Sequence, residues 1–154
     1  MPEPKFVPKP GQVDYTDIRY APVINALIFN EGKLLLVQRS LEMRMFPGLW
    51  HCIGGFLDDN KSIEEKVVEE LEEEVGIMVD RIVSMSRFAP ILREDEKYHK
   101  TWITIPVRVD ITGRDYDLNW EAHAAEWIEP AAATDYELMP DFEEVLAEVL
   151  GKPL

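Results

Sequence analysis

One amphipathic helix is marked at both of its ends in this sequence, and it is the feature that most limits how the chain can fold. Ser62 and Glu65 have the spacing of a capping box, in which each side chain hydrogen-bonds the backbone of the other residue. The apolar residues of its core face recur every four positions, with Val68 beside them: Val67, Leu71 and Val75. Gly76 supplies the residue type with which such helices commonly end. The sequence therefore predicts a helix over residues 62–75 with one apolar face, which must pack against another layer.

The residues before this helix predict strands. The apolar runs 21–29 and 33–38 are separated by Asn30-Glu31-Gly32, a short turn with glycine where a positive φ is needed, and together they predict a β-hairpin. Residues 50–57 predict a short strand that is interrupted at Gly54-Gly55, because adjacent glycines indicate a bulge or a close backbone approach.

The residues after the helix predict further strands and a second helix. Residues 81–92, 101–111 and 125–128 have strand patterns, and residues 141–150 predict a closing helix. One face of the second strand is apolar and is expected to face the core: Ile103, Ile105, Val107, Val109 and Ile111. Pro106 cannot donate a ladder hydrogen bond, which indicates a strand at a sheet edge or bulged at that point. Several strands with two helices at different points predict an α+β fold.

The length and composition indicate one folded domain. The 154 residues suffice for a single core, and we expect an N-terminal arm over residues 1–20 followed by one domain over residues 21–154. The first residues contain no apolar core of signal-peptide length, and no run approaches the roughly 20 apolar residues that cross a bilayer. The single cysteine, Cys52, excludes an intramolecular disulfide and is expected to be buried in the core of a cytoplasmic protein.

The charge balance excludes one class of partner. The chain carries 30 acidic and 16 basic residues, a net charge of −14, and so negative a surface repels phosphate backbones. We therefore expect a small-molecule partner and neither nucleic acid nor membrane, while a homodimer stays open.

Five glutamates occupy six positions near the end of the predicted helix: Glu69, Glu70, Glu72, Glu73 and Glu74. Like charges three or four positions apart repel one another, and acids near a helix C-terminus oppose the helix dipole. Such departures from local rules are typical of functional positions. At about 100° per residue, Glu70, Glu73 and Glu74 share one stripe beside the core face, whereas Glu69 and Glu72 point further round and are expected to be solvated.

Carboxylates that converge on a partly enclosed volume suit a hard divalent cation. Mg²⁺ is the first candidate, because it prefers oxygen ligands and accompanies phosphate chemistry, with Mn²⁺ as the alternative. A solvated acidic face is the simpler explanation of a bare run of glutamates, so the surrounding residues decide between the two interpretations.

Those surrounding residues resemble the Nudix box, which is a glycine, five residues, glutamate, seven residues, and then Arg-Glu-aliphatic-any-Glu-Glu-any-Gly-aliphatic. The matching residues stand at the spacing of the motif: Gly55, Glu70, Leu71, Glu73, Glu74, Gly76 and Ile77. The likeness extends over roughly residues 21 to 150 and includes the flanking segments 36–40, 47–50 and 126–128. It implies a mixed β-sheet sandwiched by helices, with a catalytic loop-helix-loop at about 55–77.

The resemblance also implies roles for individual residues. Glu70 and Glu74 would be metal ligands, Glu73 a ligand or the residue that activates water, and the carbonyl of Gly55 would face the metal. At Arg39, which ends the second hairpin strand, the family often has an arginine that contacts phosphate or base, although a surface salt bridge explains Arg39 equally well. Several members use a loop glutamate near the position of Glu121 as a further ligand or general base.

Two positions depart from the motif. Lys61 stands where the motif has its first glutamate, and Glu69 stands where it has arginine, so both positions have changed sign. In the family this pair supports the metal-binding acids. We predict that Lys61 and Glu69 contact each other directly, with the polarity of the pair reversed.

Several other side chains have both a functional and a structural interpretation. Arg44 is expected to be solvated, His123 lies in a predicted loop beside Glu121, and His51 and His99 are expected to be structural or exposed. Four aromatic residues could stack on a nucleobase, although aromatic residues more often lie in the core: Trp50, Trp102, Trp120 and Phe88.

The leading hypothesis is a metal-dependent hydrolase that cleaves the pyrophosphate bond of a nucleoside diphosphate linked to another moiety. A cation is needed there because the clustered negative charge of a pyrophosphate repels an attacking hydroxide. The alternatives are a Nudix-like module that binds or senses a nucleotide without cleaving it, and an acidic interaction domain without a ligand. No secondary motif of the kind that marks dinucleotide, ADP-ribose or NADH selectivity follows the box.

Overall fold

The computed structural model describes residues 7–11, 14 and 17–154, so the predicted N-terminal arm over residues 1–20 lies partly outside the described residues. The sheet begins with a hairpin in which β1 (Tyr20–Asn30) pairs antiparallel with β2 (Lys33–Arg39). In its two-residue turn, Glu31 and Gly32 both have a positive φ, 48° and 80°. The predicted hairpin is confirmed.

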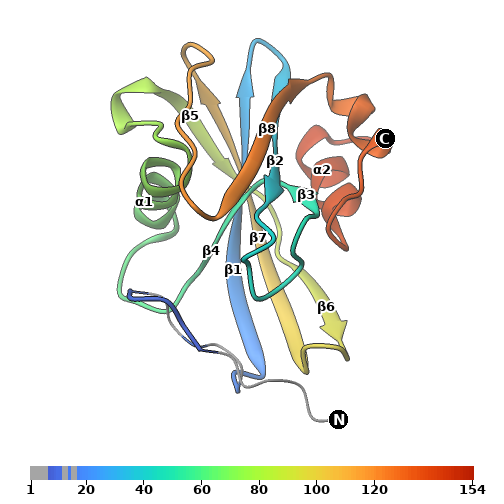
Figure 1. The fold of residues 1–154 in the computed structure, drawn as a ribbon. Helices are drawn as coiled ribbons and strands as arrows, with labels where there is room; N and C mark the ends of the chain where they lie inside the picture. Colours follow the sequence, from blue (N-terminus) through green and yellow to red (C-terminus); the bar gives the residue numbers. More distant parts are fainter. Residues whose placement is uncertain (1–6, 12–13, 15–16) are drawn as a thin grey trace.

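The two hairpin strands pair with each other only next to the turn, and a later segment joins both of them (Figure 1). β3 (Trp50–His51) pairs with β2, and β4 (Ile53–Phe56) pairs with β1. The predicted strand 50–57 is therefore interrupted at Cys52, where the segment changes partner. The prediction of a break at Gly54-Gly55 is wrong, because both glycines lie within the ladder to β1.

The long strand β7 (Lys100–Ile111) runs parallel to β1 through the middle of the sheet. Its other edge is shared by β5 (Ile82–Arg87) and β6 (Ile91–Asp95), so the predicted strand 81–92 is in fact two strands. Of the two alternatives predicted at Pro106, the edge strand is wrong, because β7 has partners on both sides, and the ladder on one side is instead interrupted at this residue. Pro106 lies opposite the break between β5 and β6, where its carbonyl accepts a hydrogen bond of 2.9 Å from the Phe88 N–H and the ladder requires no donor from proline.

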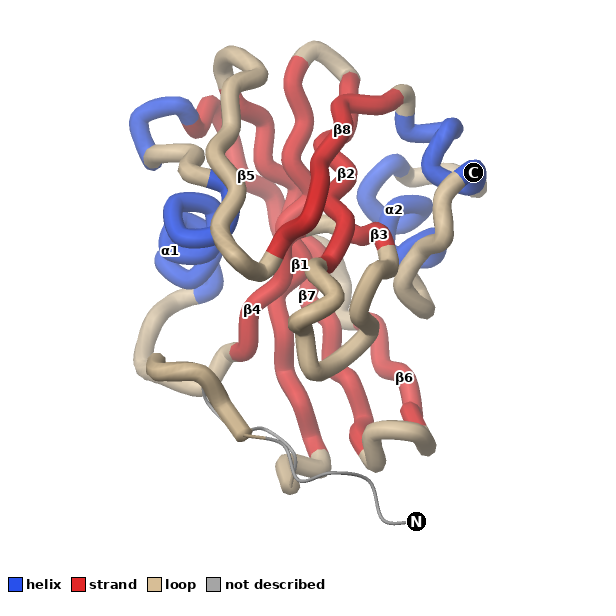
Figure 2. The backbone as a smooth tube through the Cα atoms, viewed as in Figure 1, coloured by secondary structure: helices blue, strands red, loops and turns tan. Residues whose placement is uncertain are grey.

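The two helices lie on opposite sides of the strands (Figure 2). They are α1 (Ile63–Val75) and α2 (Phe142–Leu150), and the described residues also contain two short 3₁₀ helices, Val79–Arg81 and Pro130–Asp135. The last strand, β8 (Ala122–Ile128), pairs with β2 and begins three residues earlier than the predicted one. None of the helices in the described ranges is both long and apolar enough to cross a bilayer. The α+β prediction of a mixed sheet between helices is confirmed.

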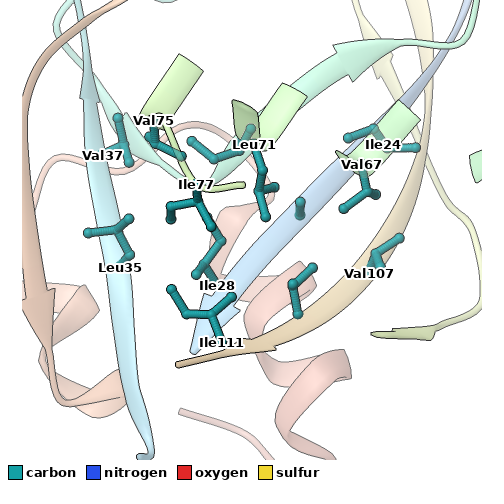
Figure 3. Packing of buried hydrophobic residues seen from close by; sticks show 13 residues of the cluster. Ile24, Ile28, Leu35, Val37, Val67, Leu71, Val75, Ile77, Val107 and Ile111 are labelled. Atoms are coloured by element: carbon teal, nitrogen blue, oxygen red, sulfur yellow. The ribbon is translucent and has the colours of Figure 1, made fainter. Parts of the chain in front are cut away.

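Both faces of the sheet are buried, because each helix covers a separate apolar cluster. Alternate residues of β1 enter different clusters: Ala26 and Ile28 pack with α1, whereas Leu27 and Phe29 pack with α2. On the α1 side the predicted helix face is confirmed, since Val67, Leu71 and Val75 are fully buried against β1 and β7 (Figure 3).

The strand face predicted for residues 103–111 is confirmed only in its second half. Val107, Val109 and Ile111 are buried in the α1 cluster, whereas Ile103 and Ile105 are half-buried. The opposite face of the same strand is also covered, because Trp102 and Thr104 are buried. An alternating pattern fixes which residues share a face, but the coverage of each face depends on the neighbouring elements.

Helix α1 begins and ends where the sequence predicts. The Glu65 N–H donates to Ser62 Oγ at 3.1 Å, and the Glu65 side chain accepts a hydrogen bond from the Ser62 N–H, so the capping box is complete. Gly76 has a φ of 64° and closes the helix by donating to the Glu72 carbonyl. The two caps fix the ends of the helix, and its buried apolar face decides which carboxylates lie toward the sheet.

Candidate active site

A cavity of about 940 Å³ opens between α1, the β3–β4 segment and the loops around them. Two chemically different groups of side chains line it. The first, called here the acidic wall, comes from α1 and the loop before β8: Glu69, Glu70, Glu73 and Glu121. The second, called here the aromatic wall, comes from β4, β7 and the loops after β2 and β6: Phe46, Phe56, Tyr98 and Trp102. A hollow with both kinds of lining can bind a ligand that is charged at one side and planar at the other.

The acidic wall contains a compact group of carboxylates. Glu69, Glu70 and Glu73 can each place one oxygen within 4.8 Å of the others. The prediction grouped Glu74, rather than Glu69, with Glu70 and Glu73. Glu74 instead lies deeper in the protein, with only 4% of its surface exposed, and the expectation that Glu69 is solvated is wrong, because Glu69 is half-buried. Glu72 is exposed, as predicted.

Glu70 is held against the backbone of β4. A Cβ added to Gly55 would lie 2.8 Å from Cγ, Cδ and Oε1 of Glu70, so only glycine leaves room for this carboxylate. The predicted close backbone approach at the double glycine is thus present, and it occurs at Gly55. At Gly54 an added Cβ would meet nothing nearer than 3.6 Å. The motif glycine therefore determines where the Glu70 carboxylate can sit.

The loop before β8 completes the acidic wall. Its backbone is fastened to the end of α1, since the Asn119 N–H donates to the Glu74 carbonyl at 3.1 Å and the Asp117 N–H to the Val75 carbonyl at 2.8 Å. The Asn119 side chain in turn accepts from the Glu121 N–H at 2.9 Å. These bonds bring Glu121 close enough to Glu70 and Glu74 to influence the ionisation of both.

Burial and mutual repulsion make these carboxylates weak acids. Burial, together with the charges of Glu121 and Glu73, raises the pKa of Glu70 to about 7. Burial raises the pKa of Glu74 well above its ordinary value, with Glu121 and Glu70 adding to the effect. Burial also raises the pKa of Glu121. Such shifts in a cavity are typical of functional sites.

The predicted contact between Lys61 and Glu69 is present, because the Lys61 ammonium hydrogen-bonds the Glu69 carboxylate. A second lysine, which the sequence interpretation missed, joins the pair. Lys66 Nζ lies 2.9 Å from Asp59 Oδ2 and 3.7 Å from Glu69 Oε1, and Lys66 is only 4% exposed. The sequence does indicate this position for Lys66, because a lysine one turn before Glu70 lies on the same side of the helix.

The hairpin arginine also lines the cavity. Arg39 is half-buried, its Nε donates to the Met45 carbonyl at 2.9 Å, and burial lowers its pKa while the charges of Glu74 and Glu121 raise it. The surface salt bridge offered as its alternative role is not formed with any residue in the described part of the chain. Arg44, which was expected to be solvated, is half-buried and lines the same cavity.

The three histidines have different positions. His51 is buried and lines the cavity, its Nε2 has no hydrogen-bond partner among the described residues, and burial lowers its pKa well below the ordinary range. His51 is therefore a neutral imidazole with unused hydrogen-bonding capacity beside Arg39. His99 is exposed. His123 is exposed on β8, and the prediction of a loop position for it is wrong.

The aromatic wall is a connected set of rings. The Phe46 ring centroid lies 4.9 Å from that of Tyr98 and 6.2 Å from that of Trp102, and the rings of Phe56 and Trp102 are 5.9 Å apart. The Tyr98 hydroxyl accepts a hydrogen bond from the Phe46 N–H at 3.2 Å and so supports a residue whose φ is +53°. Half-buried rings such as Phe46 and Phe56 leave surface that a planar ligand can cover.

The structure separates the four aromatic residues that the sequence offered as base-stacking candidates. Trp102 and Trp120 line the cavity. Trp50 and Phe88 pack instead against the apolar cluster on the α2 side, and the ring of Trp50 lies 5.0 Å from that of Tyr136. Trp50 and Phe88 are therefore residues of the apolar core, as aromatic residues more often are.

The donor set of the acidic wall fits a divalent cation. All of its side chains offer carboxylate oxygens, which hard cations such as Mg²⁺ and Mn²⁺ prefer, and the missing Cβ at Gly55 leaves the backbone accessible beside Glu70. Carboxylates with raised pKa values in a confined volume favour a positive charge that would relieve their repulsion. A cation held here would lie in the same cavity as the aromatic wall.

Comparison with known proteins identifies relatives over most of the chain. A family model described as NUDIX domain matches residues 19–149. Nucleoside triphosphatase NudI of Escherichia fergusonii is 24% identical over 131 residues, which cover 79% of this chain and 90% of that protein.

Solved structures with the same architecture are also found. The MutT protein from Methanosarcina mazei Go1 superposes with a TM-score of 0.74 at 26% identity and covers 88% of this chain and 95% of its own. The NUDIX domain of Shewanella oneidensis NrtR, solved in complex with ADP ribose, superposes with a TM-score of 0.71 at 20% identity and covers 84% of this chain and 86% of its own.

Proposed function

The chain belongs to the NUDIX domain family, and on that premise we propose that it hydrolyses the diphosphate linkage of a nucleoside diphosphate derivative with the help of Mg²⁺. The family expected from the box at residues 55–77 is confirmed, and the chain is a Nudix pyrophosphohydrolase acting on phosphorus-containing acid anhydrides.

One observation carries the proposal: the acidic wall and the aromatic wall line the same cavity. Carboxylates alone would repel a phosphate, so the acidic wall can accept a diphosphate only together with a cation. The aromatic wall can then receive the planar base of a nucleoside, since stacking on an aromatic ring tolerates any base. The two walls together favour a small nucleotide over a long polyanion.

The residues of the acidic wall would act together with Glu74, which lies behind it, and with Gly55 and Arg39. Glu70, Glu74 and the carbonyl oxygen of Gly55 would hold the cation, and Glu73 would hold it or take the proton of the attacking water. When bound, the cation neutralises the phosphate charge and activates water for attack on phosphorus. Arg39, which lines the cavity close to Glu74 and Glu121, would contact a phosphate oxygen, because its terminal guanidinium nitrogens offer a planar set of donors. Glu121 would be a further ligand or proton acceptor.

A substrate panel tests this proposal. ADP-ribose, deoxynucleoside triphosphates, a dinucleoside diphosphate and a 5′-triphosphorylated RNA oligonucleotide are incubated with Mg²⁺ or Mn²⁺ in ¹⁸O-water, and the products are resolved by mass spectrometry. We expect hydrolysis of a small nucleotide with the label on phosphorus, and loss of turnover with EDTA. Binding of a nucleotide without hydrolysis across the panel would instead support the sensing module. Cleavage restricted to the RNA would contradict the small-molecule assignment.

Glu74→Gln is the variant that tests the site. Glutamine has the shape of a protonated glutamate, and burial raises the pKa of Glu74, which favours the neutral form of this residue in the metal-free protein, so we expect the fold to be preserved. We expect a loss of turnover of at least about 100-fold, because the neutral amide cannot replace a carboxylate ligand. Glu72→Gln, at an exposed position of the same helix, is the control and retains wild-type turnover. Wild-type turnover in Glu74→Gln would show that the site is assigned wrongly.

A further inference from the structure

The most unusual carboxylate in the cavity is Glu69, which stands where the Nudix box has arginine. Its two oxygens face cations on one side, since Lys61 binds Oε2 and Lys66 Nζ lies 3.7 Å from Oε1. On the other side, the same carboxylate can bring an oxygen within 4.8 Å of oxygens of Glu70 and Glu73. Glu69 therefore lies between a pair of lysines and the acidic wall.

The lysines explain why a third carboxylate is tolerated at this place. Lys66 also binds Asp59 at 2.9 Å, and Lys61 lies 3.7 Å from the same Asp59 carboxylate, so two cations and two anions alternate around one point. The hydrogen bond from Lys66 and the backbone N–H of Lys61 lower the pKa of Asp59, which keeps this anion charged. The network compensates the charge of Glu69 without moving its carboxylate away from Glu70 and Glu73.

A simple exchange of charges would not require this placement. In an ion pair that only ties the loop 57–62 to α1, the polarity has no consequence for the cavity, and arginine at position 69 with glutamate at position 61 would serve equally. With the observed polarity, however, the negative member of the pair sits on the helix beside the acidic wall, and the positive member sits on the loop. The exchange thus adds one carboxylate oxygen to the donor set of the cavity.

We propose that Glu69 is an additional ligand of the divalent cation in this protein, and that Lys66 and Lys61 are the positioning residues that hold its carboxylate toward Glu70 and Glu73. The proposal rests on the proposed metal dependence and goes beyond it, because it assigns a metal ligand at a position where the motif has an arginine. Affinity for a hard cation rises with the number of charged oxygen ligands, so the change has a measurable consequence.

Binding of Mn²⁺ without nucleotide tests the proposal directly. The free Mn²⁺ signal in electron paramagnetic resonance is titrated with wild-type protein and with Glu69→Gln, Glu72→Gln and the double variant Lys61→Glu/Glu69→Arg. The double variant keeps an ion pair between the two positions and restores the residues of the motif, but it removes the extra carboxylate. Glu72→Gln removes one negative charge from an exposed position of the same helix and reports any general electrostatic effect.

We expect Glu69→Gln and the double variant each to weaken Mn²⁺ binding by about 10-fold or more, the size of effect that perturbed metal surroundings commonly produce, and Glu72→Gln to stay within about 2-fold of wild type. Lys66→Met should weaken binding as well, and Lys66→Arg should recover it, because arginine can again hold the carboxylate in place. If the double variant binds Mn²⁺ as tightly as wild type, the pair requires only opposite charges and the proposal is overturned.

Folding and function are separated by the same set of experiments. Glu69→Gln is nearly isosteric with the wild type and remains informative even where the double variant unfolds, which circular dichroism would reveal. Mn²⁺ binding that depends on Glu69 in a protein that hydrolyses no nucleotide would uphold the ligand and refute the proposed activity. Hydrolysis of a nucleotide by a protein whose Mn²⁺ affinity is unchanged in Glu69→Gln would uphold the proposed activity and refute Glu69 as a ligand.

Discussion

The raised pKa of Glu70 predicts that the metal-free protein loses stability as the pH rises through neutrality. In the unfolded chain this carboxyl has a pKa of 4.5, whereas in the folded protein burial and the charges of Glu121 and Glu73 raise it to about 7. Between these two values the folded state keeps a proton that the unfolded state has released. The stabilisation is therefore fully present at low pH and disappears as the pH passes the folded pKa.

The size of the effect follows from the same two values. Raising the pH from about 6.5 to about 8 should remove about 0.8 kcal/mol of unfolding free energy through Glu70 alone. Glu74 and Glu121 change stability in the same direction, because their pKa values are also raised. His51 acts in the opposite direction, because its pKa is lowered and near or below the ordinary pKa of histidine only the unfolded state binds its proton; this contribution is the same in Glu70→Gln and cancels in the comparison with wild type.

Urea unfolding in EDTA at the two pH values measures this difference for wild type and Glu70→Gln. The fall in unfolding free energy should be smaller in Glu70→Gln by about 0.8 kcal/mol, while Glu72→Gln should behave like wild type. Saturating Mg²⁺ should abolish or invert the wild-type trend, because the cation binds the ionised carboxylates and its affinity grows as they lose their protons. An equal fall in wild type and Glu70→Gln would refute the argument that Glu70 holds a proton in the folded protein.

The remaining predictions concern the two walls of the cavity. Gly55→Ala should weaken Mn²⁺ binding and slow turnover, because the new Cβ would displace Glu70. Gly54→Ala, whose added Cβ has no contact nearer than 3.6 Å, should leave both unchanged. Equal effects of the two variants on Mn²⁺ binding in calorimetry would contradict the role of the motif glycine. Phe56→Ala should raise the KM for a nucleotide by about 5-fold to 100-fold through lost stacking, with a smaller effect on kcat. Phe88→Ala, on the α2 side of the sheet, should lower the melting temperature without changing KM. If Phe56→Ala and Phe88→Ala have the same KM, the base does not bind at the aromatic wall.

Sequence periodicity predicts the fold well where local signals agree with the tertiary structure. The capping box at Ser62, the stop at Gly76 and the hairpin turn at Gly32 are all present, because each depends on residues that are neighbours in the chain. The division of the strand 81–92 and the interior position of Pro106 were missed for one reason. Both depend on which strand lies alongside, and one sequence contains no direct information about its distant partners.

The same limit applies to the candidate site. The helical stripe correctly placed Glu70 and Glu73 together, and the reversal of both charges correctly predicted the contact between Lys61 and Glu69. Helical angles alone placed Glu69 in solvent, because they do not include Lys66 and Asp59, which hold it at the cavity. His51 was likewise missed, since an imidazole on a short strand gives no sign of lying in a cavity until the loops around it are known.

The change of strand partner at Cys52 connects the two walls of the cavity. β3 stays with β2 and carries His51, while β4 crosses to β1 and brings Gly55 under Glu70. The next residue, Phe56, belongs to the aromatic wall. Consecutive residues of a strand are about 3.3 Å apart along the strand and their side chains point to opposite faces, so the two walls meet around β4. The acidic wall is therefore built around one residue of β4 and the aromatic wall around its neighbour. A substrate that reaches both walls is positioned by a rigid ladder, so a change at Gly55 should affect metal binding and turnover, whereas a change at Phe56 should affect mainly nucleotide affinity.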